Sequence, residues 1–257
     1  MKRLIKRFDQ NKNLLSIYFT AGFPQLESTV PILKALEKGG ADFVEVGMPY
    51  SDPLADGPTI QNSSTKALNN GMSLRVLFDQ LKEIDQKINM PIILMGYLNP
   101  ILKFGFEPFI RKCRETGVSG LIIPDLPFET YAEKYEALFS QNNISNIFLI
   151  TPQTEEGRIR KLDQASTTFL YMVSSAAVTG IREGLSESQI QYFERIKKMQ
   201  LKTPTMVGFG ISNHQTFTQV CHYAHGAIVG SAFVKHLEHH GDDPEEIIKF
   251  VKKLKNH

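Results

Sequence analysis

Short apolar runs, rich in β-branched residues, recur along the chain and are separated by charged, amphipathic stretches. The runs are continuous rather than alternating, which is typical of strands that are covered on both faces. The stretches between them, such as residues 131–140 and 155–165, have the length and the apolar spacing of helices. The predicted strands cover residues 14–19, 43–46, 92–95, 120–123, 147–150, 169–173, 205–207 and 227–229.

This alternation of strand and helix, eight times over, predicts an α/β fold of the closed (β/α)8 TIM-barrel type rather than an open sheet. The length of 257 residues is that of one such barrel, so we expect a single domain over residues 1–257. An extra N-terminal helix, roughly residues 1–8, is expected to cap the bottom of the barrel with Leu4, Ile5 and Phe8. Chemistry is expected at the opposite end, on the loops that follow the strands.

Composition and charge narrow the class of protein. The chain is 42% hydrophobic and 22% charged, with 29 basic against 27 acidic residues, which indicates neither nucleic acid nor a membrane as partner. No apolar stretch approaches the ~20 residues of a membrane span, and the charged start lacks the apolar core of a signal peptide. We therefore expect a cytoplasmic protein. Cys113 and Cys221 have no C-x-x-C partner and are expected to be structural thiols.

The second predicted strand carries a carboxylate, Glu45, inside an otherwise apolar run. A lone ionised carboxylate is costly in a buried strand, so a partner or a raised pKa is expected. One interpretation is a glutamate that a neighbouring hydroxyl or backbone donor satisfies. The other is a general acid and base whose pKa has moved toward neutrality.

The loop after this strand, residues 48–58, contains three prolines and two further carboxylates. So stiff a loop can hold Asp56 at a fixed position above the barrel mouth, where it would take part in catalysis. Alternatively, Asp56 is the N-cap of the helix that Gly57 and Pro58 begin. Both interpretations fit the spacing.

Two Gly-rich turns, residues 208–212 and 230–231, follow the last two predicted strands. Many barrels bind a phosphate there, on backbone N–H groups and a helix N-terminus, and two such turns on adjacent strands favour that interpretation over plain tight turns. Residues 174–184 have the composition of a mobile lid or of a surface loop. His236, His239 and His240 are interpreted as a solvated helix end, and we predict no metal.

The segment 45–58, EVGMPYSDPLADGP, resembles the signature of the tryptophan synthase alpha subunits. The resemblance covers the whole chain, with LMGYLNP at 94–100, PDLP at 124–127, VTG at 178–180 and GFGIS at 208–212 in the family's order. It implies a carbon–carbon lyase of L-tryptophan biosynthesis. The implied reaction is the retro-aldol cleavage of indole-3-glycerol phosphate to indole and glyceraldehyde 3-phosphate, without a cofactor.

The resemblance also implies roles for individual residues. Glu45 would shuttle protons, helping to protonate the indole C3 and accepting the proton of the glycerol C3′ hydroxyl. Asp56 would accept a hydrogen bond from the indole N–H and stabilise the positive charge that develops on the ring. Thr179 would close the lid toward Asp56. The implied phosphate contacts are Tyr171, Gly180, Gly208, Gly210, Gly230 and Ser231, and the implied indole contacts are Phe19, Tyr97 and Leu98.

The implied partner is the pyridoxal-phosphate beta subunit, which receives indole through a tunnel in an alpha2beta2 heterotetramer. Pro53 and Asn99 would face that partner, and this chain would bind no pyridoxal phosphate itself. Two departures from the family pattern affect the lid and its surroundings. Ser175 and Ala177 occupy lid positions that commonly carry Arg and Gly, and Phe23 stands where many members carry Asp.

Three other functions remain open at this stage. The altered lid is compatible with a catalytically weak subunit that mainly activates its beta partner. Another phosphate-binding barrel, such as an indole-glycerol phosphate synthase or an isomerase of histidine synthesis, is disfavoured, because a synthase would need catalytic lysines and the predicted strands contain none. The third is a stand-alone lyase that releases free indole.

Overall fold

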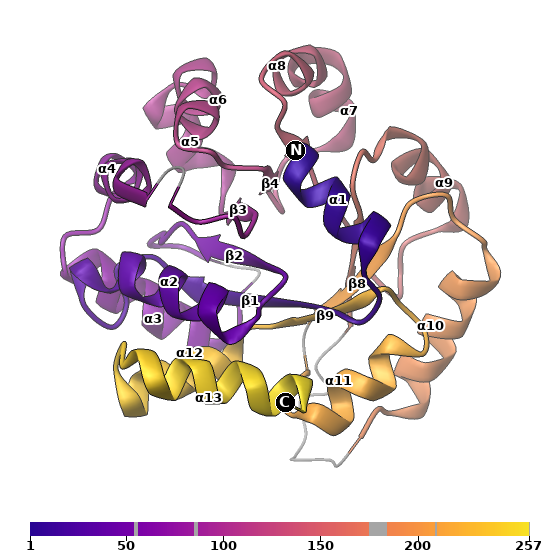
Figure 1. Cartoon of the computed structure of the whole chain (residues 1–257). Helices are drawn as coiled ribbons and strands as arrows, with labels where there is room; N and C mark the ends of the chain where they lie inside the picture. The colour runs from indigo at the N-terminus through magenta and orange to yellow at the C-terminus, as the bar shows by residue number, and fades with distance from the viewer. Residues whose placement is uncertain (54–55, 85–86, 175–183, 209, 257) are drawn as a thin grey trace.

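A computed structural model of the chain describes residues 1–53, 56–84, 87–174, 184–208 and 210–256. Its strands pair in parallel and form one sheet in the order β5-β4-β3-β2-β1-β9-β8-β7-β6, with helices around the outside (Figure 1). The strands are β1 (Leu14–Thr20), β2 (Phe43–Gly47), β3 (Ile92–Met95), β4 (Gly120–Ile122), β5 (Ser145–Asn146), β6 (Phe148–Ile150), β7 (Leu170–Val173), β8 (Thr205–Gly208) and β9 (Gly226–Val229).

The helices lie in the stretches between the strands, as the amphipathic pattern predicts. They are α1 (Lys2–Gln10), α2 (Thr29–Gly39), α3 (Pro58–Asn69), α4 (Leu74–Ile84), α5 (Leu98–Phe104), α6 (Phe106–Glu115), α7 (Phe128–Thr130), α8 (Glu136–Gln141), α9 (Glu156–Ala165), α10 (Glu187–Lys198), α11 (His214–Cys221), α12 (Ser231–His240) and α13 (Pro244–Lys255). A 3-10 turn, η1 (Leu26–Ser28), precedes α2, and a π-helical turn, η2 (Tyr131–Tyr135), joins α7 to α8.

The nine strand segments fill the eight positions of a TIM barrel, because β5 and β6 are two parts of one strand. β5 pairs with β4, and β6 pairs with β7. Between them the Ile147 N–H still donates to the Leu121 carbonyl at 2.9 Å, so the ring continues through the break. The predicted (β/α)8 barrel is confirmed. The fifth strand begins earlier than predicted, because Ser145 and Asn146 are polar and lie outside the apolar run.

The strands are buried on both faces, which explains their continuous apolar sequence. All seven residues of β1 and all five of β2 are buried. One face of each strand points into the barrel and the other contacts the helices. The register of β1 on β2 pairs Tyr18 with Glu45 and Thr20 with Gly47.

The helix α1 covers the end of the barrel at which the strands begin, and Figure 1 shows it lying across the ring of strands. Its Phe8 ring lies 6.0 Å from the ring of Phe43, the first residue of β2, and 5.4 Å from that of Phe169, which precedes β7. Leu4 is fully buried, whereas Ile5 is half-buried. The predicted cap is confirmed, and the opposite end is left for the site.

Two further predictions concern the chain as a whole. Within the described ranges, no helix has both the length and the apolar character needed to cross a membrane. Cys113 on α6 is a buried free thiol, and Cys221 on α11 is a half-buried one. Burial raises the pKa of both thiols, that of Cys221 to about 12, so both remain protonated and have the low reactivity of structural cysteines.

Candidate active site

Glu45 lies in the middle of β2 and is fully buried inside the barrel. Its Oε1 accepts a long hydrogen bond of 3.4 Å from the Ser16 hydroxyl, and its Oε2 has no hydrogen-bond partner among the described residues. Burial raises the pKa of Glu45 to about 8, while the hydrogen bond from Ser16 opposes that shift. A neighbouring hydroxyl therefore satisfies only part of this carboxyl group, which is protonated at neutral pH and has one oxygen free to react.

Asp56 lies on the loop after β2 and is directed toward the loop after β3. Its Oδ2 accepts a hydrogen bond of 3.1 Å from the Tyr97 hydroxyl. Burial raises the pKa of Asp56, and the bond from Tyr97 lowers it by less. The N-cap of α3 is Gly57, followed by a proline in the first turn, so the interpretation of Asp56 as a helix cap is wrong.

The side chain of Asp56 forms part of the wall of a small cavity at the barrel mouth. The cavity has a volume of about 10 Å³, which is room for a single water. Tyr50 and Tyr97 lie beside each other in its wall, with ring centroids 5.4 Å apart. The lining residues are Tyr18, Met48, Tyr50, Pro53, Asp56, Ser64, Met95, Gly96, Tyr97 and Pro124.

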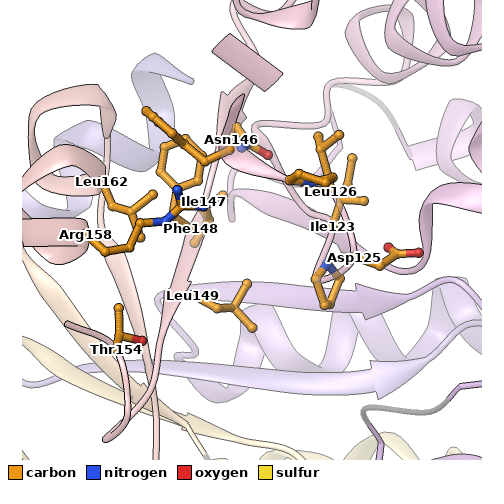
Figure 2. A pocket seen from close by; sticks show the side chains of 13 residues that line it. Ile123, Asp125, Leu126, Asn146, Ile147, Phe148, Leu149, Thr154, Arg158 and Leu162 are labelled. Carbon is orange, nitrogen blue, oxygen red and sulfur yellow. The ribbon is translucent and has the colours of Figure 1, made fainter. Parts of the chain in front are cut away.

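A second, larger cavity of about 380 Å³ shares Pro124 with the first. Figure 2 shows Arg158 and Leu162, from α9, on one side of it and Ile123, Asp125 and Leu126, which follow β4, on the other. Its wall includes residues of both β5 and β6, of which the first pairs with β4 and the second with β7. Open space therefore lies next to the wall that carries Asp56.

The three residues expected around an indole ring lie in three different environments. Tyr97 lines the small cavity. Leu98 begins α5, and its backbone N–H donates to Asp125 Oδ1 at 2.8 Å. Phe19 is fully buried, but Tyr18, its neighbour, lines the cavity; because side chains alternate along a strand, Phe19 faces the helices.

Tyr18 is one of the residues at this wall that sequence reasoning missed. The signal was present: Ser16, Tyr18 and Thr20 alternate with the apolar residues Ile17 and Phe19. Such an alternation places three hydroxyl groups on one face of a strand that otherwise reads as fully apolar.

The residues expected at a phosphate that the structure describes lie on β7, at the end of β8 and directly after β8 and β9. Tyr171 on β7 is buried, and a Cβ on Gly208 would overlap its hydroxyl, so Gly208 provides the space for the phenol. Burial raises the pKa of Tyr171, and the nearby Glu45 raises it further, so the phenol is neutral. Gly210 adopts a positive φ of 80° after β8.

The last of these residues lie at the N-terminus of α12. Gly230 is the N-cap of this helix and Ser231 its first residue. The first-turn N–H groups of a helix lack intrahelical partners and carry the positive end of the helix dipole. This turn is therefore suited to an anion at the barrel mouth. Thr179 and Gly180, like Ser175 and Ala177, lie outside the described residues.

The predicted partner-facing residues lie near the same mouth. Asn99 is exposed, and its Nδ2 donates to the Tyr50 hydroxyl at 3.3 Å. Pro53 is half-buried in the wall of the small cavity. Leu102, one helical turn beyond Asn99 on α5, is 49% exposed, which sequence reasoning did not anticipate.

Two of the three histidines of α12, His236 and His240, pack on each other, and His236 also packs on the last helix. The rings of His236 and His240 lie 4.5 Å apart, and His236 also contacts Phe250 at 4.9 Å. Burial lowers the pKa of His236. Across the described part of the chain, His, Cys, Asp and Glu side chains form no group of three that could hold a metal ion.

Comparison with known proteins identifies the family. The family model described as tryptophan synthase alpha chain matches residues 4–257. The tryptophan synthase alpha chain of Christiangramia forsetii is 55% identical over 255 residues, covering 99% of each chain. That of Flavobacterium johnsoniae is 53% identical over 255 residues, covering 99% of this chain and 100% of the other.

Solved structures agree with this. Tryptophan synthase from M. tuberculosis in its aminoacrylate-bound form matches with a TM-score of 0.85 at 29% identity, over 98% of this chain and 97% of the other. A mutant tryptophan synthase alpha-subunit from the hyperthermophile Pyrococcus furiosus matches with a TM-score of 0.87 at 34% identity, over 96% and 99% of the two chains. The chain therefore belongs to the tryptophan synthase alpha chain family.

Proposed function

We propose that this chain cleaves indole-3-glycerol phosphate, the reaction of its family, with Glu45 as proton donor and acceptor and Asp56 as the group that binds the indole N–H. The observation that carries this assignment is the buried Glu45 carboxyl, whose Oε2 accepts no hydrogen bond from the described part of the chain and whose pKa is about 8. A carboxyl group with a pKa near the working pH can both give and take a proton in one turnover.

Glu45 both donates a proton in this reaction and recovers one at its end. Protonated Glu45 gives its proton to the indole C3, and the bond between C3 and the glycerol C3′ then breaks. The electron pair of that bond returns to the ring and restores its aromaticity. The C3′ hydroxyl becomes an aldehyde by losing its proton to the Glu45 carboxylate, which regenerates the acid.

Asp56 acts at the other end of the ring. As a carboxylate it accepts the indole N–H and stabilises the positive charge that the ring carries once C3 is protonated. The Tyr97 hydroxyl holds its Oδ2 at 3.1 Å and opposes the rise of its pKa. The two carboxyl groups thus have different environments, one fully buried and one half-buried, which suits an acid and a charged stabiliser.

The phosphate of the substrate is assigned to the turns after β8 and β9. Support comes from the first turn of α12, which begins at Ser231, and from the positive φ of Gly210. Tyr171 and Gly208 form the wall next to these turns. Thr179 and Gly180 remain predictions from the sequence.

The experiment that tests this function measures indole release from indole-3-glycerol phosphate by the purified chain, alone and with a cognate beta subunit. We expect release by the wild type, and a loss of at least about a hundredfold in kcat for both Glu45→Gln and Asp56→Asn. Circular dichroism and urea unfolding establish that each variant is folded. An active Glu45→Gln variant contradicts the assignment.

A beta subunit is the partner of the family, and we propose an alpha2beta2 assembly in which the mouth of the barrel faces it. Asn99 and Leu102 lie one turn apart on α5 and are both exposed, which supports a contact there, since a half-exposed leucine beside the site gains from being covered. Analytical ultracentrifugation of the mixed subunits gives the stoichiometry.

Two further proposals concern the whole chain. We propose that residues 1–257 are one domain, with support from the single sheet and from one hydrophobic cluster that includes residues from Leu4 to Leu254. Limited proteolysis that yields a stable half would contradict it. A cytoplasmic location stays a prediction from composition, and cell fractionation tests it.

A further inference from the structure

The first turn of α10 lies beside the turn after β8 that contains Gly210, which we call the phosphate turn. A Cβ on Gly210 would lie 3.7 Å from Nε2 of Gln189, the third residue of α10. Just before α10, a Cβ on Gly184 would lie 3.5 Å from Oε1 of Gln219, on the helix α11 that follows the phosphate turn. Two separate approaches therefore place the start of α10 against this turn and its helix.

The side-chain amide of Gln189 is held in one orientation by a capping box with Ser186, the N-cap of α10. Its Oε1 accepts from the Ser186 backbone N–H at 2.9 Å and from the Ser186 hydroxyl at 3.1 Å. The Ser186 hydroxyl in turn accepts from the Gln189 backbone N–H at 3.3 Å. A backbone N–H can only donate, so the atom that faces it is the amide oxygen. The NH2 group is therefore the end of the amide that lies near Gly210.

This NH2 group donates to no acceptor among the described residues. The Gln189 side chain is half-buried, so the two amide protons remain available to a ligand at the phosphate turn. Gly210 has a φ of 80° and no side chain, and its bare backbone leaves the space between the turn and the NH2 group open. A donor in this position forms its strongest hydrogen bonds with an anion.

The residue type at position 189 matches this role. A capping box takes glutamate as well as glutamine at its third helical residue, and the charge of a glutamate is favourable at a helix N-terminus. Glutamine differs from glutamate in offering an NH2 group on its second atom, whereas a carboxylate oxygen there would repel an anion held at Gly210. The cap alone does not need that NH2 group.

We propose that Gln189 is a further substrate-binding residue, whose Nε2 donates a hydrogen bond to an oxygen of the substrate phosphate at the phosphate turn. The capping box with Ser186 fixes which end of the amide faces that phosphate. The proposal rests on the lyase function proposed above and on its assignment of the phosphate, to which it adds a side-chain donor from α10.

The test compares two ligands that differ only in the phosphate. Indole-3-propyl phosphate and indole-3-propanol share the ring and the propyl chain, and neither is cleaved, so calorimetry gives a dissociation constant for each without turnover. Gln189→Glu keeps an oxygen for the Ser186 N–H but replaces the NH2 group by a carboxylate oxygen. It should weaken binding of indole-3-propyl phosphate at least about tenfold, because repulsion replaces a charge-assisted hydrogen bond. Binding of indole-3-propanol should change less than about twofold, since it has no phosphate to lose a contact.

Gln191→Glu is the matched control. Gln191 is exposed on the same helix, and its amide bonds only Glu187, so this variant adds the same charge to α10 and should leave both dissociation constants unchanged. Urea unfolding shows that both variants are folded. In turnover, Gln189→Glu should raise the KM for indole-3-glycerol phosphate at least about tenfold and change kcat less than about threefold, because the phosphate lies away from the bond that breaks.

Three results would overturn the proposal. Equal weakening of both ligands by Gln189→Glu means that the substitution acts through packing, and unchanged binding of indole-3-propyl phosphate means that Gln189 makes no contact. A wild type that binds the two ligands equally removes the phosphate site and the contact with it. The lyase function fails separately, if the folded wild type releases no indole even with its beta subunit; the calorimetric comparison still decides the role of Gln189, because it needs no turnover.

Discussion

Replacing Glu45 by glutamine should stabilise the chain at neutral pH while it removes catalysis. The pKa of Glu45 is raised from 4.5 to about 8 by burial. Between these values the folded chain holds a proton that the unfolded chain releases. The contribution of Glu45 to stability is therefore fully present below pH 4.5 and is lost as the pH rises toward 8, because the folded state binds more protons than the unfolded state.

The size of this change in stability follows from the pKa shift of Glu45. The free energy of unfolding should fall by about 1.4 kcal/mol for each pH unit in this window. At pH 7, 2.5 units above the ordinary value of 4.5, the accumulated cost is about 3 kcal/mol. Glutamine does not titrate, and its oxygen can still accept a hydrogen bond from Ser16. The free energy of unfolding of Glu45→Gln therefore lacks this pH-dependent loss and differs from that of the wild type otherwise only by a pH-independent amount for the buried amide.

Urea unfolding of the wild type and of Glu45→Gln at pH 5, 6, 7 and 8 measures the effect. The stability of Glu45→Gln relative to the wild type should grow steadily over this series. Asp52→Asn, at an exposed carboxylate on the loop after β2, is the matched control and should show no such growth. Parallel curves for Glu45→Gln and the wild type would refute a raised pKa for Glu45.

Other predictions follow from particular contacts. Phe8→Ala removes the ring that packs on Phe43 and Phe169 and should lower the free energy of unfolding by about 2–3 kcal/mol, with unchanged kcat in the folded protein; a loss below about 0.5 kcal/mol would contradict the cap. Gly208→Ala places a methyl group against the hydroxyl and the ring of Tyr171 and should lower kcat/KM about tenfold or more; an unchanged kcat/KM would contradict this close approach. Leu102→Glu introduces a charge on the exposed face of α5 and should weaken stimulation by the beta subunit at least about tenfold, whereas basal indole release by the chain alone stays unchanged.

The barrel could be predicted because it depends on a local sequence feature, the apolar run of each buried strand, that is repeated along the chain. Strands covered on both faces need unbroken apolar runs, and seven of the eight predicted runs correspond to single strands in the structure. The exception is the fifth, where the polar pair Ser145 and Asn146 forms β5, and Ile147 separates it from β6. Which partner each half takes depends on the ring closing, and no local pattern contains that information.

The site could be predicted where a residue type differed from what its position in the fold normally carries. A carboxylate in an apolar strand drew attention to Glu45, and its burial and raised pKa agree with that expectation. Asp56 fitted both a helix cap and a catalytic group, and the structure separates them, because Gly57 is the N-cap of α3 and Asp56 accepts a hydrogen bond from Tyr97 on another loop. Whether Phe19 or Tyr18 lines the site depends on which face of β1 each side chain occupies.

The decisive measurement is the pH dependence of kcat/KM for indole release by the wild-type chain with its beta subunit. Because protonated Glu45 begins the reaction, kcat/KM should be constant around neutral pH and should fall tenfold per pH unit above an apparent pKa near 8. The residual activity of Glu45→Gln should lack that fall. A profile in Glu45→Gln with the same rate and the same alkaline limb as the wild type would contradict Glu45 as the acid of this reaction.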